Sequence, residues 1–201
     1  MKSLRSWRIL AALGAMALVL TIGVGAVAAA GPHGGGARPA SVRGPVAGLP
    51  QAVSSGTLSP AQAAALAGMA DEEKLARDLY ASFAAMYPSG VWDTIGAAES
   101  THLAAVRTLL ARYGIADPTG GLSAGSFASP GTAALYTSLL AQGSASEAAA
   151  FGVGRTVELD DIARLDAARI GVTAADVLRV YGNLRNGSTQ HLRAFSRLLG
   201  I

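Results

Sequence analysis

Four acidic residues and two histidines recur at helical spacing among apolar residues, and they are the groups in this chain that could carry chemistry. Glu99 and His102 lie three positions apart, and Glu158 and Asp161 repeat that spacing further along the chain. Because side chains three apart on a helix project from the same side, each pair is expected to share one face. Together with two single residues, the candidate set is Glu73, Glu99, His102, Glu158, Asp161 and His191.

Such a set is typical of a metal centre. Each of the six falls in register with apolar residues, so its side chain is expected to point into the core. Burying a carboxylate without a partner costs several kcal/mol, and two divalent metal ions would balance the charge and occupy the free oxygen and nitrogen atoms. Inward glutamates and Glu-x-x-His pairs are the ligands of di-iron and di-manganese helical bundles. Carboxylates and imidazoles without sulfur favour Fe, with Mn as the second choice, for the two ions.

Each residue also has a plainer interpretation when it is taken alone. Glu73 could form a surface ion pair with Arg77, four positions on, and Glu158 with Asp161 could belong to a solvated acidic turn. His191 could be a core histidine that a backbone carbonyl satisfies. Both histidines of the helical region fall on apolar faces, however, and this coincidence favours a shared metal site.

Helix signals distribute these residues over several long helices. Ser59-Pro60, a cap residue followed by proline, predicts a helix that runs to about residue 87. An apolar stripe from 92 to 113 predicts a second helix, with Gly114 as its C-terminal cap. A connection that contains Gly, Pro and Ser, residues 115–129, then leads into a short helix.

Two further helices complete the expected fold. Ser144 and Glu147 form a capping-box pattern, which predicts the start of a helix to about residue 170. Thr173 and Asp176 indicate the start of the last helix, which would run to 199 and loosen at Asn186-Gly187. Since no segment alternates with a period of two, the expected fold class is all-α: a bundle of four main helices with a long crossover and one short extra helix.

The first 56 residues differ in character from this helical domain, which is expected to span 57–201. Basic residues in the first eight positions precede an uncharged apolar stretch, Ile9–Ala30, that ends in small residues. Residues 1–30 therefore predict an export signal peptide or an uncleaved membrane anchor, and the chain is expected to be secreted or periplasmic. Residues 31–56, rich in Gly and Pro, predict a flexible linker.

Composition excludes several classes of function. Cysteine is absent, which removes disulfides, thiolate metal sites and cysteine nucleophiles. The formal net charge is +3, and Lys2, Arg5 and Arg8 account for the whole excess, so no basic footprint for nucleic acid remains in the rest of the chain. Contact with a membrane is expected only through an uncleaved N-terminal segment.

Three motifs resemble those of rubrerythrin-type proteins in the ferritin-like superfamily. The segment from Glu73 to Tyr80 is similar to the pattern Glu-x-x-Ala-Arg-x-x-Tyr of their first helix, and Glu99-Ser-Thr-His102 is similar to the Glu-x-x-His of their second. Glu158 with Asp161 resembles the acid pair of their third helix.

From about residue 67 to 199 the chain resembles more closely an uncharacterised ferritin-like family, the domain of unknown function family 2202. This resemblance implies a ferritin-like four-helix bundle with a dinuclear metal centre, and it implies no particular reaction. It is carried by residues 72–78 (EEKLARD), 98–102 (AESTH), 112–118 (RYGIADP), 157–162 (VELDDI) and 187–195 (GSTQHLRAF).

One position departs from the ferritin-like pattern. Such sites usually place a glutamate three residues before the final histidine, and here that residue is Ser188. Asp161 could supply the missing carboxylate, with Glu99 and Glu158 as bridging ligands and one histidine at the end of each metal. The same departure is compatible with a single ion, so the number of ions stays open.

The function expected from these residues is metal-dependent redox chemistry on O2 or peroxide by an exported protein. The alternative is a metal-binding or structural bundle of the cell envelope without turnover. A third hypothesis is a bundle that binds a partner through an apolar groove, with its acids solvated. Alanine-rich helix faces are compatible with a homodimer.

Overall fold

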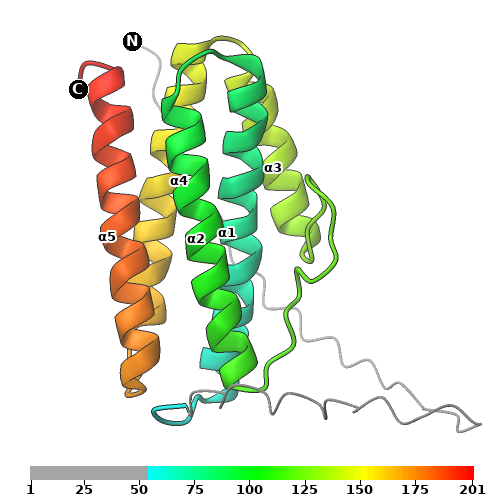
Figure 1. Ribbon diagram of the computed structural model, residues 1–201, viewed down its shortest axis with the longest axis vertical. Helices are drawn as coiled ribbons and strands as arrows, with labels where there is room; N and C mark the ends of the chain where they lie inside the picture. The colour runs from blue at the N-terminus through cyan, green and yellow to red at the C-terminus, as the bar shows by residue number, and fades with distance from the viewer. Residues whose placement is uncertain (1–53) are drawn as a thin grey trace, which may run out of the picture. The chain divides into compact units, whose positions relative to one another are not determined.

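The computed structural model describes residues 54–201; the expected signal or anchor (1–30) and residues 31–53 of the expected linker lie outside them. Within the described range the chain forms five helices and no strand (Figure 1). None of these helices combines the length and apolar composition that a membrane crossing needs. The helices are α1 (Pro60–Met86), α2 (Val91–Arg112), α3 (Pro130–Gly143), α4 (Glu147–Ala168) and α5 (Ala175–Leu198).

The predicted limits of α1 and α2 are confirmed. Ser59 is the N-cap of α1 and accepts a hydrogen bond from the backbone N–H of Gln62, with proline at the first helical position. At the end of α2, Gly114 adopts a φ of 65°, a left-handed conformation that glycine reaches without steric cost. The next residue, Ile115, donates a hydrogen bond back to the carbonyl of Leu110 and closes the helix end.

The predicted capping box at Ser144 and Glu147 is wrong. Ser144 has helical backbone angles and ends α3, where its hydroxyl donates to the carbonyl of Leu140. An N-cap needs an extended backbone, and Ser146 has one. Its side chain accepts a hydrogen bond from the N–H of Ala149, and Glu147 is the first residue of α4.

The start predicted for the last helix at Thr173 is also wrong. The N-cap of α5 is Ala174, whose side chain cannot accept a hydrogen bond. Instead, Ser55 accepts the N–H of Asp176 at 2.8 Å, so a residue 121 positions away caps the helix. The expected loosening at Asn186-Gly187 does not occur, because α5 continues through both residues.

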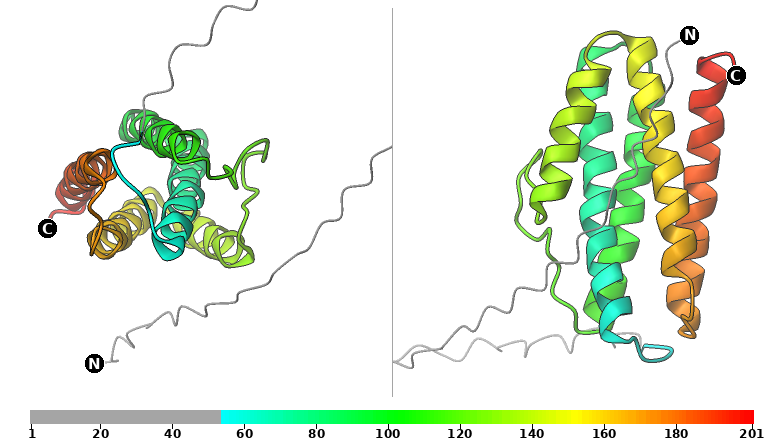
Figure 2. Two further views of the ribbon diagram at one scale, coloured as in Figure 1. Left: turned by 90° about the horizontal axis from the view of Figure 1, so that it is seen from below. Right: turned by 180° about the vertical axis from the view of Figure 1, so that it is seen from behind.

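Four of the helices, α1, α2, α4 and α5, lie side by side and enclose the core (Figure 2). The main packing pairs are α1 with α2 and α4 with α5, joined by contacts of α1 with α4 and of α2 with α5. Helix α3 packs outside, against α1 and α4 (Figure 1). The side of the core formed by α1 and α4 is therefore covered by a further helix.

The core consists of two apolar clusters stacked along the helices. One contains Leu66, Val106 and Tyr181, and the other contains Tyr80 and Trp92. On every long helix the candidate residues lie in the sequence interval between these clusters. The intervals are Ala70–Leu75 on α1, Ile95–Leu103 on α2, Val153–Leu165 on α4 and Leu184–Phe195 on α5.

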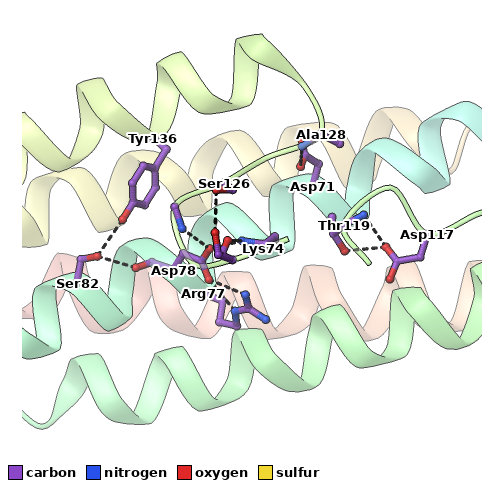
Figure 3. Close-up of polar contacts among 12 residues, drawn as sticks. Asp71, Lys74, Arg77, Asp78, Ser82, Asp117, Thr119, Ser126, Ala128 and Tyr136 are labelled. Carbon is purple, nitrogen blue, oxygen red and sulfur yellow. Dashed lines mark hydrogen bonds and ion pairs between the residues drawn. The ribbon is translucent and has the colours of Figure 1, made fainter. Parts of the chain in front are cut away.

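The crossover from α2 to α3 is fastened to α1 (Figure 3). Asp71 accepts hydrogen bonds from the backbone N–H groups of the loop residues Ala128 and Ser129. Lys74, which is fully buried, forms an ion pair with Asp78 and donates to a loop carbonyl. Because α1 carries Glu73 among these residues, the same helix segment holds both the loop and a candidate ligand.

Candidate metal centre

Three carboxylates and two imidazoles meet where the four long helices face one another. Glu73 comes from α1, Glu99 and His102 from α2, Glu158 from α4 and His191 from α5. The three glutamates are at most 2% exposed. The structure therefore brings five of the six predicted residues into one buried cluster.

One half of the cluster consists of Glu73, Glu99 and His102. The Nδ1 atom of His102 lies 2.8 Å from Glu99 Oε2 and 3.5 Å from Glu73 Oε2. Ligand atoms of all three residues lie within 4.8 Å of one another. Bonds of about 2.1 Å to one ion would place ligand atoms about 3 to 4 Å apart, so the spacing suits a single metal ion.

The other half repeats this arrangement with Glu99, Glu158 and His191. The Nδ1 atom of His191 lies 2.8 Å from Glu99 Oε1 and 3.6 Å from Glu158 Oε2. The imidazoles of His102 and His191 stack at 5.7 Å between ring centroids. Glu99 belongs to both halves and directs one oxygen into each, whereas Glu158, which we expected to bridge as well, belongs to one.

Buried polar atoms at the cluster lack hydrogen-bond partners within the protein. These atoms are Glu73 Oε1, Glu99 Oε1 and His191 Nδ1. The last two lie 2.8 Å apart but are not aligned as donor and acceptor. Buried polar groups are normally satisfied, so atoms that converge without bonding to each other fit ligands of a common ion.

The electrostatics of the cluster couple the two histidines to the carboxylates. Burial opposes the charge of both imidazoles, but the adjacent glutamates outweigh it. They raise the pKa of His102 to about 10 and that of His191 to about 9. Burial likewise opposes the charge of Glu99, and contacts with both imidazoles lower its pKa to about 2. Without metal, contacts with both imidazoles therefore favour the ionised form of the central carboxylate.

The outer carboxylates lack equivalent compensation. Burial raises the pKa of Glu73 well above its ordinary value and also raises that of Glu158. The contact with His102 lowers the pKa of Glu73, and the contact with His191 lowers that of Glu158, but neither cancels the effect of burial. A bound cation would supply the charge that both carboxylates need to stay ionised.

Asp161 lies beside the cluster and belongs to neither three-residue group. Ser188 donates a hydrogen bond to Asp161 Oδ2 and is itself 1% exposed. Burial raises the pKa of Asp161 to about 7, against the effect of that hydrogen bond. The serine that stands where a glutamate was expected thus holds an aspartate of the neighbouring helix.

Two further residues contact the cluster. Tyr80, the last residue of the motif that begins at Glu73, donates to Glu158 Oε1 at 2.6 Å. Gly187, where we expected the last helix to loosen, lies against the imidazole of His102. A glycine in a helix interior, four residues before His191, is the sequence signal that could have identified it.

Comparisons with known proteins match most of the helical region. The profile of an uncharacterized protein domain family, DUF2202, matches residues 62–200. The uncharacterized protein MJ0754 of Methanocaldococcus jannaschii is 40% identical over 131 residues, which are 65% of this chain and 71% of that protein. A crystal structure of the hypothetical protein MJ0754 is similar at a TM-score of 0.72 and 37% identity, over 74% of this chain and 85% of that one.

Proposed function

This chain belongs to the DUF2202 family of uncharacterized domains, and we propose that it is a ferritin-like four-helix bundle with a dinuclear metal centre. The two ions are Fe, with Mn as the second choice, and the centre does redox chemistry on O2 or peroxide. The proposal includes export from the cytoplasm, on the strength of the basic and apolar N-terminal sequence.

The observation that carries the proposal is the position of Glu99 between two imidazoles. One carboxylate oxygen points to each histidine, and each half adds a further glutamate. Two ions placed in these halves would share Glu99 and bind the unpartnered buried oxygen and nitrogen atoms. With Asp161 nearby, four carboxylates stand opposite two divalent ions, so the charges balance with both imidazoles neutral.

The arrangement of the helices supports the ferritin-like part of the proposal. Each long helix contributes at the same level of the core, and α2 carries an inward Glu-x-x-His pair. On α5, Ser188 stands three residues before His191, so this helix offers one ligand, and the neighbouring carboxylate comes from Asp161 of α4. The ligand set is thus less symmetric than it would be if α5 carried a Glu-x-x-His pair, as α2 does.

Fe or Mn would supply the change of oxidation state. The protein residues would bind the ions through Glu73, Glu99, His102, Glu158 and His191. Tyr80 keeps its proton, since burial raises its pKa well above the ordinary value, and it orients Glu158 by donating to Oε1. The apolar clusters on both sides exclude water from the carboxylates. This enclosure favours small oxidants over organic substrates.

Metal content per chain tests the proposal directly. The purified chain is loaded with Fe(II) or Mn(II), freed of excess metal and measured by elemental mass spectrometry. We expect about two ions per chain, followed by consumption of peroxide or O2. A folded helical protein without bound metal would overturn the proposal, and a single ion would overturn its dinuclear part.

A second candidate function is metal binding without turnover in the cell envelope. The deep burial of the glutamates favours it, because an enclosed site can hold ions tightly without admitting a substrate. Two bound ions with no consumption of peroxide or O2 would select this function over the redox one.

A further inference from the structure

Gly187 lies inside α5 and packs against the imidazole of His102 on α2. A Cβ atom built at residue 187 would lie 2.6 Å from both Cε1 and Nε2 of His102. In protein structures a Cβ atom essentially never makes a non-bonded contact this short. Any residue other than glycine at this position therefore requires His102 to move.

The backbone of α5 gives no other reason for glycine at this position. The helix runs without interruption from 175 to 198, and Gly187 is not among the glycines with positive φ. Glycine is unfavourable in a helix interior because it has the most conformational freedom to lose. Gly182 on the same helix differs, since a Cβ there would meet nothing within 4 Å.

The ring of His102 is held from two sides. Its Nδ1 edge faces Glu73 and Glu99, at 3.5 and 2.8 Å. The neighbouring edge of the ring, formed by Cε1 and Nε2, faces the backbone of α5 at Gly187. The close approach of the two helices at this glycine fixes how far the imidazole can withdraw from the carboxylates.

We propose that Gly187 is a positioning residue that keeps His102 in its half of the metal centre, an inference that rests on the proposed function. A side chain at 187 displaces the imidazole and removes the nitrogen ligand from the Glu73, Glu99 and His102 half. The half formed by Glu99, Glu158 and His191 keeps its ligands. The residue thus determines whether the site holds two ions or one.

The fold can absorb this displacement. The side chain of His102 is 13% exposed, whereas the glutamates beside it are nearly inaccessible. Helix α3 packs against α1 and α4, so it does not cover the side of the core formed by α2 and α5. A displaced imidazole can turn toward solvent on that side, and a Gly187 variant is therefore expected to fold.

The first experiment compares Gly187→Ala with Gly182→Ala in the full chain loaded with Fe(II) or Mn(II). We expect about two ions per chain in the wild type and in the Gly182 variant, and about one in the Gly187 variant at unchanged helix content. Alanine favours helices more than glycine does, so a loss of metal cannot come from weaker helix propensity. Two ions bound to the Gly187 variant with wild-type affinity would overturn the proposal.

A second experiment needs no metal. In the metal-free full chain, Gly187→Ala is introduced with and without His102→Ala, and the melting temperature is measured. We expect the substitution to lower the melting temperature when His102 is present and to leave it equal or higher when His102 is absent. Equal losses in both backgrounds would refute the contact. If the wild type binds no ion, the proposed function fails, and this cycle still decides whether Gly187 positions His102.

Discussion

Tyr80 donates a hydrogen bond of 2.6 Å to Glu158 Oε1, across 78 positions of sequence and between α1 and α4. Its ring packs against Trp92 and Phe195, with centroids 5.8 and 5.6 Å away. The aromatic cluster thereby fixes the position of a hydroxyl group, and that hydroxyl fixes one oxygen of a candidate ligand. The other oxygen, Oε2, is left to face His191.

Replacing Tyr80 with Phe should weaken metal binding while preserving the fold. Groups that orient metal ligands through hydrogen bonds typically contribute a factor of about 10–100 in affinity. We expect such a loss for the half that contains Glu158, measured by competition with a chelator. Tyr136→Phe is the matched control, because its hydroxyl bonds Ser82 outside the cluster. Equal affinities for both variants would refute the orienting role.

Substitution of the three glutamates should give two distinct results. Glu99→Gln removes the ligand that both halves share, so the metal content should fall from about two ions per chain to none. Glu73→Gln and Glu158→Gln each affect one half and should leave about one ion. Glu72→Gln is the control on α1, since Glu72 pairs with Arg164 at the surface. The same metal content in the Glu99 and Glu73 variants would contradict the shared position of Glu99.

Asp161→Asn should keep both ions, because the carboxylate lies outside the two ligand groups. The amide preserves an oxygen that can accept the hydrogen bond from Ser188. We expect weaker binding through the loss of one negative charge, without a change in the number of ions at saturation. Loss of one ion in elemental analysis would instead make Asp161 a direct ligand, as the sequence suggested.

The sequence predicted the helices and the cluster well because both depend on local periodicity. Glu99 and His102 are three apart on a strongly apolar face, and that spacing alone places them together once the helix forms. Features that depend on distant segments were not predictable. Ser55 caps α5, and Gly187 touches His102 only because α2 and α5 pack together.

The two helix starts that were predicted wrongly have different physical causes. At Ser144 a good capping pattern coincided with the last turn of the preceding helix, whose hydrogen bonds continued to this residue. At Thr173 the cap was expected from the local side chain, but Ser55, which precedes α1, supplied it. At Ser144 the competing hydrogen bonds are local and belong to α3, whereas at Thr173 the competing contact is tertiary.

Lys74→Met should destabilise the protein and release the crossover loop. The ammonium group of this buried lysine pairs with Asp78, donates to the carbonyl of Ser123 and lies 4.8 Å from the ring centroid of Phe127. Breaking a buried ion pair by removing one partner costs about 3–5 kcal/mol when the other charge is left alone, and since Asp78 keeps Arg77 we expect a loss near the lower end of this range. Urea unfolding should show this loss, and a protease of broad specificity should cleave residues 115–129 faster.

Arg77→Met provides the comparison for Lys74, because Arg77 bonds the same aspartate from a more exposed position. Exposed ion pairs contribute about 1 kcal/mol or less, so the loss of stability should be much smaller. Similar losses for both variants would show that burial of the ammonium group is not what makes the Lys74 contact important.

Asp176→Asn should lower stability at neutral pH and lose its effect in acid. Burial opposes the charge of Asp176, but hydrogen bonds from Ser55, Tyr113 and Arg112 outweigh it and hold its pKa well below the ordinary value of 3.8. The folded state then binds fewer protons than the unfolded state near that pH. The carboxylate therefore stabilises the fold above about pH 4, and this contribution is lost as the pH falls toward the lowered pKa.

Loss of hydrogen bonds to a buried charged group costs about 2 kcal/mol, which corresponds to a drop of about 4–8 °C in melting temperature for a domain of this size. The difference from the wild type should be constant between pH 6 and 8 and shrink below pH 4, with Asp160→Asn, at an exposed position of α4, as the control substitution. A difference that stays constant down to pH 3 would mean that the amide disrupts packing at the end of α5, and that the charge of Asp176 contributes nothing.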